Sequence, residues 1–230
     1  MSNPGETPLN WKPVPRPGPV TLRGRHVTLE PLNAERHASD IWQAVAGYDE
    51  LWTWLFDGPF STEAVLRRAI EEKQAASNTV FLAIVPEATG QAVGWASLMR
   101  AEPVHGVIEV GNILFAPTLQ RTTAATEAMF LMATHVFDHL GYRRYEWKCN
   151  ALNLPSRRAA ERLGFTFEGI FRQHMVIKGQ SRDTAWHSML DCEWPARKSA
   201  FNAWLAQDNF DSEGRQRMSL TEIAAAPPDL

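Results

Sequence analysis

The chain has 230 residues, of which 44% are hydrophobic and 21% charged, and its formal net charge is −3. This composition is typical of one large or two small globular domains, and the slightly acidic balance argues against partners such as nucleic acid or an anionic membrane surface. No apolar run approaches the ~20 residues of a membrane span. Two cysteines, Cys149 and Cys192, are too few for a disulfide framework, so we expect a reducing, cytoplasmic setting.

The N-terminal third predicts an arm, one strand and two helices. Residues 1–20 contain six prolines and are expected to form an extended arm. Alternation over residues 25–32 predicts a strand, and residues 34–45 predict a helix. An aromatic cluster at 51–56 precedes a second helix, which Ser61 or Thr62 can cap and which runs to residue 76.

The middle of the chain predicts three consecutive strands followed by one long helix. The strands cover residues 80–85, 92–99 and 107–115, and the short loops between them indicate a meander. The helix that follows carries one apolar stripe, because its apolar residues recur at helical spacing until Gly141 ends it. The residues of this stripe are Met129, Met132, Ala133, Val136, Phe137 and Leu140.

The last third predicts a strand, a short helix, an antiparallel strand pair and a final helix. These elements are expected at residues 145–149, 153–164, 166–177 with 184–192, and 194–205, and the tail from residue 208 is expected to be mobile.

The stretch from Trp147 to Phe165 is the most informative in the chain. It predicts a strand end and a short helix that Asn153 caps and Gly164 terminates. Within it, the order of Asn153, Ser156, Arg158-Ala159, Glu161 and Gly164-Phe165 resembles motif B of the GNAT superfamily of acetyl-CoA-dependent N-acyltransferases, and more narrowly its RimJ/RimL-type branch.

The resemblance implies an α/β fold with a mixed sheet of about seven strands flanked by helices, and the predicted element order agrees with it. It covers roughly residues 20–195. We therefore expect an arm at residues 1–20, one acetyltransferase domain at 21–207, and a tail at 208–230.

Acetyl-CoA carries a diphosphate, which is suited to backbone N–H groups at a helix N-terminus. The loop before the striped helix resembles motif A of the family, with Thr123 where the family normally has Gly. A Thr-capped core helix without a ligand is the alternative. By this resemblance the cofactor-binding residues in and after this loop are Gln120, Arg121, Thr122, Thr123, Ala124, Ala125 and Thr126.

The resemblance also assigns the pantetheine arm of acetyl-CoA. The backbone of Leu114, Phe115 and Ala116 would pair with the pantetheine amides, because the preceding strand resembles the central GNAT strand, which splays from its neighbour. Asn153 would contact the same arm, or only cap its helix.

Acetyl transfer requires deprotonation of an amine and protonation of a thiolate. By resemblance Glu109 is the candidate base, and its alternative is a solvated strand carboxylate. Ser156 is the candidate donor to the CoA sulfur and a further cofactor contact, and its alternative is a local backbone hydrogen bond. Cys149 is expected to be a core thiol, and the seven histidines show no close ligand pair, so no metal is expected.

The resemblance implies that the amine acceptor is a protein N-terminal α-amine or a small amine. Candidate substrate-binding residues are Trp52, Trp54, Phe56 and Asn112, although hydrophobic core is the alternative for at least two of the aromatic side chains. Asn112 departs from the family pattern, which more often has an aromatic residue there.

The leading hypothesis is direct acetyl transfer to a primary amine. The alternative is a catalytically silent CoA-binding or protein-interaction module with the same fold. Because family members often dimerise, the resemblance also suggests that this chain forms a homodimer.

Overall fold

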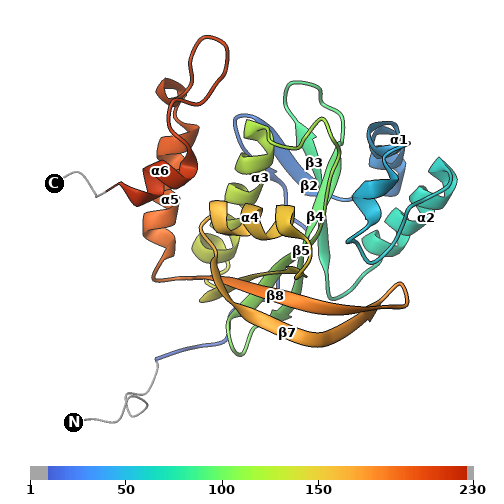
Figure 1. Ribbon diagram of the computed structural model, residues 1–230, viewed down its shortest axis with the longest axis horizontal. Coiled ribbons are helices and arrows are strands. Elements are labelled where there is room, and N and C mark those ends of the chain that lie inside the picture. Colours follow the sequence, from blue (N-terminus) through green and yellow to red (C-terminus); the bar gives the residue numbers. More distant parts are fainter. Residues whose placement is uncertain (1–9, 227–230) are drawn as a thin grey trace.

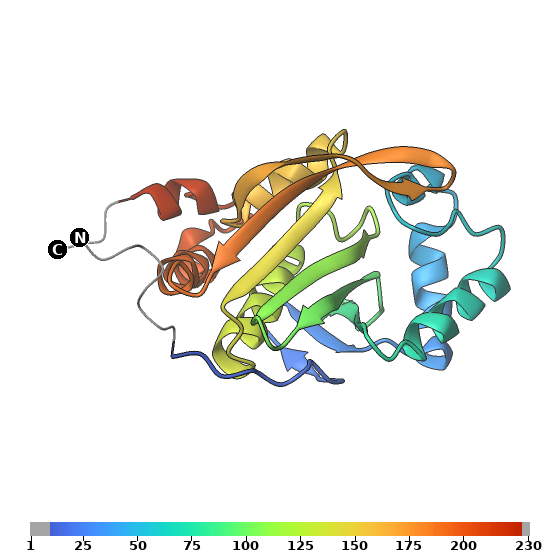
Figure 2. The ribbon, with the colours of Figure 1, turned by 90° about the horizontal axis from the view of Figure 1, so that it is seen from below.

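The computed structural model describes residues 10–226, and its centre is one eight-stranded mixed sheet (Figures 1 and 2). The strand order is β1-β2-β3-β4-β5-β6-β8-β7, and every neighbouring pair is antiparallel except β5–β6. The short β1 adds one strand to the seven expected. The strands are β1 Leu22–Arg23, β2 Val27–Pro31, β3 Val80–Pro86, β4 Gly94–Glu102, β5 Val107–Phe115, β6 Arg144–Asn150, β7 Thr166–Ile177 and β8 Gln180–Leu190.

Most of the helices begin at a side-chain cap. Asn33, Thr62, Thr122, Asn153 and Ser219 each accept a hydrogen bond from the backbone N–H three residues later, which satisfies one of the free donors of a helix start. The α-helices are α1 Ala34–Val45, α2 Glu63–Gln74, α3 Thr123–Thr134, α4 Leu154–Arg162, α5 Trp194–Leu205 and α6 Leu220–Ala225.

The two faces of the sheet bury two separate cores, because successive side chains of a strand point to opposite sides. On β3, Leu82 and Ile84 belong to the core beneath α3 and α5, whereas Ala83 belongs to the core beneath α1 and α2. On β4, Ala96 and Trp95 divide in the same way. Helices therefore cover both faces (Figure 1).

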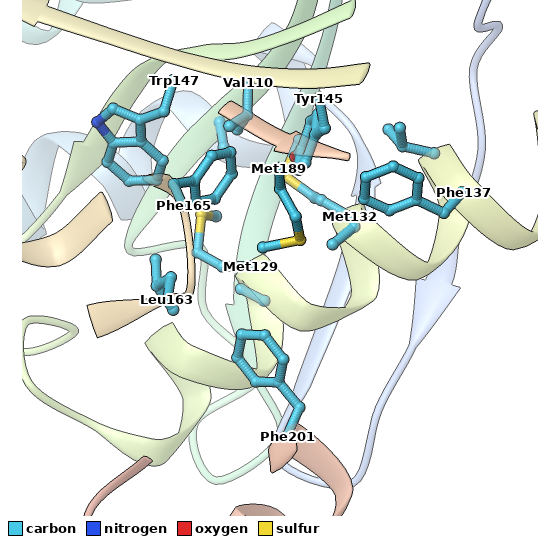
Figure 3. Packing of buried hydrophobic residues seen from close by; sticks show 14 of the residues in the cluster. Val110, Met129, Met132, Phe137, Tyr145, Trp147, Leu163, Phe165, Met189 and Phe201 are labelled. Carbon is cyan, nitrogen blue, oxygen red and sulfur yellow. The ribbon is translucent and has the colours of Figure 1, made fainter. Parts of the chain in front are cut away.

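The predicted apolar stripe is buried against the sheet. Met129 and Met132 lie among Val110, Tyr145 and Met189, as Figure 3 shows. The stripe does not lie on one regular α-helix, since α3 ends at Thr134 and a π-helical turn, His135–His139, continues it. Gly141, with φ of +74°, then ends the helical segment as expected.

The parallel pair β5–β6 separates halfway along its length. It is paired from Val107 to Val110 on β5, opposite Arg144 to Trp147 on β6. Beyond that point β5 stays paired with β4, and β6 stays paired with β8. The two strands part because each follows its other neighbour, as the family resemblance predicted.

A bulge in β5 lies where the strands part. Gly111 is opposite Ser97 and Leu114 is opposite Trp95, so Asn112 and its successor together face a single residue of β4. Asn112 has φ of +47°, and its side-chain oxygen accepts a hydrogen bond from the Trp95 indole at 3.4 Å. The bulge thus directs the Asn112 backbone toward the opening between the strands.

The hairpin formed by β7 and β8 extends across to the side of α1 and α2 (Figure 2). Its turn, Lys178-Gly179, has positive φ at both residues, which suits the twist of a two-residue hairpin. Lys178 donates a hydrogen bond to the carbonyl of Trp52 at 2.7 Å. The β8 strand begins at Gln180, four residues before the predicted start. The hairpin extends beyond the apolar residues from which the strand was predicted.

Both end segments lie against the sheet domain where they are described. Residues 10–20 have no regular secondary structure, as expected, but Trp11 and Val14 donate hydrogen bonds to the carbonyls of Val104 and Pro103. The tail expected to be mobile from residue 208 instead forms α6, whose Leu220 is buried in the core beneath α5. Residues 1–9 and 227–230 lie outside the described chain, and the predicted domain division stays a prediction.

Candidate active site

A cleft of about 940 Å³ passes through the opening between β5 and β6. On one side of the sheet it is lined by the start of α3 and by Ser156 of α4. On the other side it is lined by Glu109, Lys148 and Phe56. The cleft therefore connects the two faces of the sheet at the only parallel strand pair of the described chain.

The loop before α3 presents unpaired backbone donors. The Thr122 hydroxyl accepts a hydrogen bond from Ala125 N–H at 3.1 Å and donates to the Leu119 carbonyl at 2.7 Å. The N–H groups of Thr123 and Ala124, which stand first in the helix, form no hydrogen bond with any residue between 10 and 226. These donors and the helix dipole can hold an anion. Because the single Thr122 proton is already donated to the Leu119 carbonyl, the Thr122 hydroxyl has no proton left to donate to a phosphate.

Thr123 occupies an ordinary helical position. The residue with the left-handed backbone is Arg121, with φ of +62°, two positions earlier. The conformational freedom of glycine is therefore not required at Thr123, although its absent side chain would still allow a closer approach. Thr123 lines the cleft, and its hydroxyl forms no hydrogen bond within the described part of the chain.

Most of the residues predicted to bind the cofactor lie together in the cleft. Ten of the twelve line the cleft, and the exceptions are Ala116, which is fully buried, and Ala124, whose contribution is a backbone N–H. Gln120 donates its side-chain amide to the Phe115 carbonyl at 3.0 Å. That carbonyl is thus occupied by the chain itself, which the sequence did not indicate.

The hydroxyl oxygen of Ser156 is held beside the C-terminal end of β6. The Trp147 indole donates to Ser156 Oγ at 3.0 Å, and the Asn153 side chain accepts from Ser156 N–H at 3.1 Å. The indole uses a lone pair of Oγ, so the hydroxyl proton stays available for another acceptor. Burial raises the pKa of the neighbouring Cys149 thiol, and the nearby Ser156 hydroxyl lowers this pKa to a smaller extent. Cys149 is a buried core thiol, as predicted.

Glu109 is a buried member of a charge network, and the alternative of a solvated strand carboxylate is wrong. It is 2% exposed and lines the cleft. Arg100 donates to both of its oxygens, at 3.0 and 2.8 Å, and Lys148 Nζ lies 3.1 Å from Oε2. Lys148 also pairs with Glu146 at 2.6 Å. Since both Glu109 oxygens have cationic partners, contact with an amine requires a bridging water or the opening of an ion pair.

Comparison with known proteins identifies the family. Residues 26–166, more than half of the chain, match the model of the acetyltransferase (GNAT) domain. The chain is a GNAT acetyltransferase. Members of this family transfer an acetyl group from acetyl-CoA to an amine.

Similar proteins agree with this assignment. A GCN5-related N-acetyltransferase from Brucella melitensis is 50% identical, with a TM-score of 0.91 over 94% of this chain and 98% of that one. A protein of Bacillus subtilis strain 168, named "Putative ribosomal N-acetyltransferase YdaF", is 28% identical over 75% of this chain and 96% of its own length. An acetyltransferase from Salmonella typhimurium, described as modifying the N-terminal serine of ribosomal protein L7/L12, shares the fold at 17% identity and a TM-score of 0.64, over 74% of this chain and 99% of that one.

The predicted aromatic wall of this GNAT acetyltransferase is only partly in the cleft. Trp54 and Phe56 line it, as does Asn112. Trp52 is 2% exposed and packs edge-on against Phe60, with Trp95 beyond it. Trp52 is therefore a core residue, and its assignment to substrate binding is not supported. The sequence could not separate these side chains, because the turn Asp49–Trp52 has no long periodicity to assign its faces.

Several lining residues were missed by sequence reasoning. Lys148 could have been found, since strand alternation puts it on the opposite face from Trp147 and Cys149. Arg182 had no local signal. The remaining group comprises one residue near the end of α5 and four residues of the segment after it, which was expected to be a tail: Trp204, Phe210, Gly214, Arg215 and Gln216.

Two further properties of the described chain bear on its chemistry. No helix among residues 10–226 is long and apolar enough to cross a membrane. Within the same residues, no three His, Cys, Asp or Glu side chains are arranged to hold a metal ion.

Proposed function

We propose that acetyl-CoA binds on the α3–α4 side of the cleft and that a primary amine enters from the opposite side of the sheet. The observation that carries this proposal is the continuous cleft from the free N–H groups of Thr123 and Ala124 to Glu109. A long, flexible cosubstrate can lie along such a cleft with its phosphates at one end and its thioester near the other.

The cofactor half would use the backbone of α3 and the open edge of β5. The diphosphate would accept hydrogen bonds from Thr123 and Ala124 N–H, assisted by the free Thr123 hydroxyl and the exposed Arg121 side chain. The pantetheine arm would lie between β5 and β6, beside Leu114, Phe115 and Asn153. Because Gln120 occupies the Phe115 carbonyl, binding would either displace this amide or use the neighbouring backbone groups.

The chemistry would be direct transfer. The neutral amine attacks the acetyl carbonyl carbon, a C–N bond forms, and the C–S bond breaks as the proton leaves nitrogen. Glu109 would take that proton through a water, because its own oxygens are ion-paired. Ser156 would donate its hydroxyl proton toward the departing sulfur, and its oxygen is already oriented by Trp147.

The acceptor would be a protein N-terminal α-amine or a small primary amine. The name of the Bacillus subtilis relative, a putative ribosomal N-acetyltransferase, supports an amine of a ribosomal protein. The exposed Trp54 and half-buried Phe56 at the cleft support an amine attached to an extended or apolar group.

The test combines a binding and a turnover measurement. Acetyl-CoA at a hundredfold excess over its Kd should stabilise the protein by about 2.7 kcal/mol, and Arg121→Glu should reduce the rise in melting temperature. CoA-thiol release should be observed with a panel of amines. Ser156→Ala and Glu109→Gln should each lower kcat, by roughly 10²-fold or more for a true general acid or base. Binding without thiol release for any amine would favour the silent CoA-binding module, and absence of binding would refute the proposal.

A further inference from the structure

The acceptor side of the cleft contains a buried arginine that forms no hydrogen bond or ion pair within the described part of the chain. Arg182 on β8 is 6% exposed and lines the cleft. Its Nε is buried without a hydrogen bond, and its guanidinium forms no hydrogen bond or ion pair with residues 10–226. A buried charge is costly unless it is paired, so an unpaired guanidinium at a binding cleft points to a ligand that completes it.

Sheet register places Arg182 on the acceptor face. Lys148 is opposite Trp186 of β8, and its Nζ lies 3.9 Å from the centre of that ring. Arg182 is four residues before Trp186, so strand alternation puts both on the same face as Lys148. Phe56 lies across the cleft, with its ring centre 5.7 Å from the Arg182 guanidinium carbon. The guanidinium therefore lies between the sheet and the aromatic wall.

The other cations of this face are already neutralised. Arg100 pairs with Glu109, and Lys148 pairs with both Glu109 and Glu146. Glu146 also pairs with Arg144, which in turn pairs with Glu168. These three cations and three carboxylates balance one another, so within the described chain none of these carboxylates is left to pair with Arg182. Burial, the largest cause, also lowers the pKa of Arg182, as expected for a desolvated cation.

The hairpin holds this arginine in place. A bulge in β7 puts three residues opposite one, between Phe171 and Met175. Gln173 N–H donates to the Asp183 side chain at 2.7 Å, which fixes the backbone next to Arg182. The hairpin tip is anchored to Trp52 through Lys178. Arg182 is thus presented by a braced strand.

We propose that Arg182 binds a carboxylate carried by the acceptor, next to the amine that is acetylated. A guanidinium has a planar fork of donors that matches a carboxylate, and the Phe56 ring lies beside it, 5.7 Å from the guanidinium carbon. The carboxylate comes either from a free amino acid or from an acidic side chain of an N-terminal peptide. This inference rests on the proposed function and specifies its acceptor.

The test uses matched pairs of acceptors with the acetyl-CoA-loaded protein. One pair is an amino acid and its α-carboxamide, and the other is a short peptide amide with glutamate or glutamine at its second position. In the parent protein and in Arg182→Gln, the ratio of kcat/KM within each pair is measured. Comparing this ratio between proteins cancels the different intrinsic reactivities of the amines.

We expect Arg182→Gln to lower the carboxylate-to-amide ratio at least about tenfold in one pair, since a hydrogen bond to a charged group is lost. The affected pair identifies the source of the carboxylate. Arg172→Gln removes an exposed guanidinium from the same hairpin and is the matched control, with an unchanged ratio. An equal effect of Arg182→Gln on both members of both pairs would overturn the proposal.

Two further readouts separate this inference from folding and from the proposed function. Because Arg182 forms no hydrogen bond or ion pair with residues 10–226 and only faces the Phe56 ring, Arg182→Gln should lower the melting temperature little, and a clear loss would show a structural role instead. If no amine releases CoA thiol, the proposed function fails, and calorimetry with CoA and the N-acetylated products decides the inference. Tighter binding of the carboxylate product, lost in Arg182→Gln, supports it, whereas equal binding of carboxylate and amide refutes it.

Discussion

At the scale of the residue, position in the local backbone decides which side chains are free to act. Thr122 and Thr123 are adjacent and chemically identical, yet the first is used as a helix cap and the second has an unpaired hydroxyl facing the cleft. Two charged residues differ in the same way. Both oxygens of Glu109 have cationic partners, whereas Arg182 forms no hydrogen bond or ion pair within residues 10–226. The free members of these pairs are the candidates for ligand contacts.

Replacing Thr123 tests the hydroxyl account of phosphate binding. Thr123→Val keeps the branched shape and removes the donor, so it should weaken CoA binding by about 1.5–3 kcal/mol. Thr123→Gly removes the side chain at a position with ordinary helical dihedrals, and it should bind more weakly than the parent if the hydroxyl contributes. Calorimetric titration with CoA measures both. Equal Kd values for Thr and Val at this position would contradict the account.

A pH-dependent contribution to stability is expected at Glu168. The hydrogen bond from Arg144 is the largest cause that lowers the Glu168 pKa from 4.5 to about 2. Because the folded pKa is depressed, this stabilisation is present above pH 4.5 and is lost as the pH falls toward 2. Glu168→Gln should reduce the unfolding free energy by about 1 kcal/mol at pH 7, the upper range for a solvent-screened pair, and by almost nothing near pH 2.

Urea unfolding over this pH range would check the prediction. Glu213→Gln, which alters an exposed pair with Arg215, is the control and should change stability little at any pH. A Glu168→Gln deficit that persists at pH 2 would show that the effect is not due to ionisation.

At the scale of the element, the start of α3 serves both stability and the proposed phosphate site. The Thr122 cap holds Ala125 N–H and so leaves the two preceding N–H groups directed outward. The same kind of cap begins α2, where the Thr62 hydroxyl accepts a hydrogen bond from Val65 N–H. Thr62 has no proposed role in the cleft. Comparing the two caps separates the cost of a cap from the cost of a disturbed binding loop.

Thr122→Ala should lower the unfolding free energy by about 1 kcal/mol and also weaken CoA binding, because the loop loses its link to Leu119. Thr62→Ala should cause a similar loss of stability with no change in the Kd for CoA. Chemical denaturation and calorimetry measure the two effects. If both variants keep the parent affinity, the cap has no part in organising the phosphate site.

At the scale of the whole molecule, segments distant in sequence complete both ends of the cleft. The hairpin of β7 and β8 reaches the turn before α2 through Lys178 and Trp52. The end of α5 brings Trp204 to the other end of the cleft, and the segment after α5 adds Phe210 and Gln216. Trp204 donates to the Gln216 side chain at 2.8 Å, and α6 then packs beneath α5 (Figure 1).

The end segment should therefore be part of the cooperative fold. Leu220→Ala removes a side chain that is 2% exposed and should destabilise the protein by about 2–5 kcal/mol. Thr221→Ala, at the exposed neighbouring position, is the control and should have little effect. Urea unfolding followed by tryptophan fluorescence measures the difference. Equal stability of both variants would show that α6 does not contribute to the core.

The elements of the fold were largely predictable because their signals are local. Helix α1 and strand β5 were predicted with the bounds that the structure shows, since each has clear periodicity and clear end signals. The Asn153 cap and the Gly164 stop were predicted for the same reason. The helix in the end segment was not predicted, because the short α6 packs against α5 and has little periodic pattern of its own.

The sequence by itself indicated the family resemblance, the loop proposed for the cofactor and the strand that carries Glu109. Each of these is a contiguous motif, so its residues can be recognised from their order along the chain. Tertiary structure alone decided which side chains meet in the cleft. Pairing of β5 with β6, and their separation after Val110, creates the opening, and the register of β8 brings Arg182 to it. Such contacts depend on strand pairing across dozens of residues, and no local pattern encodes the partner that a buried charge has or lacks.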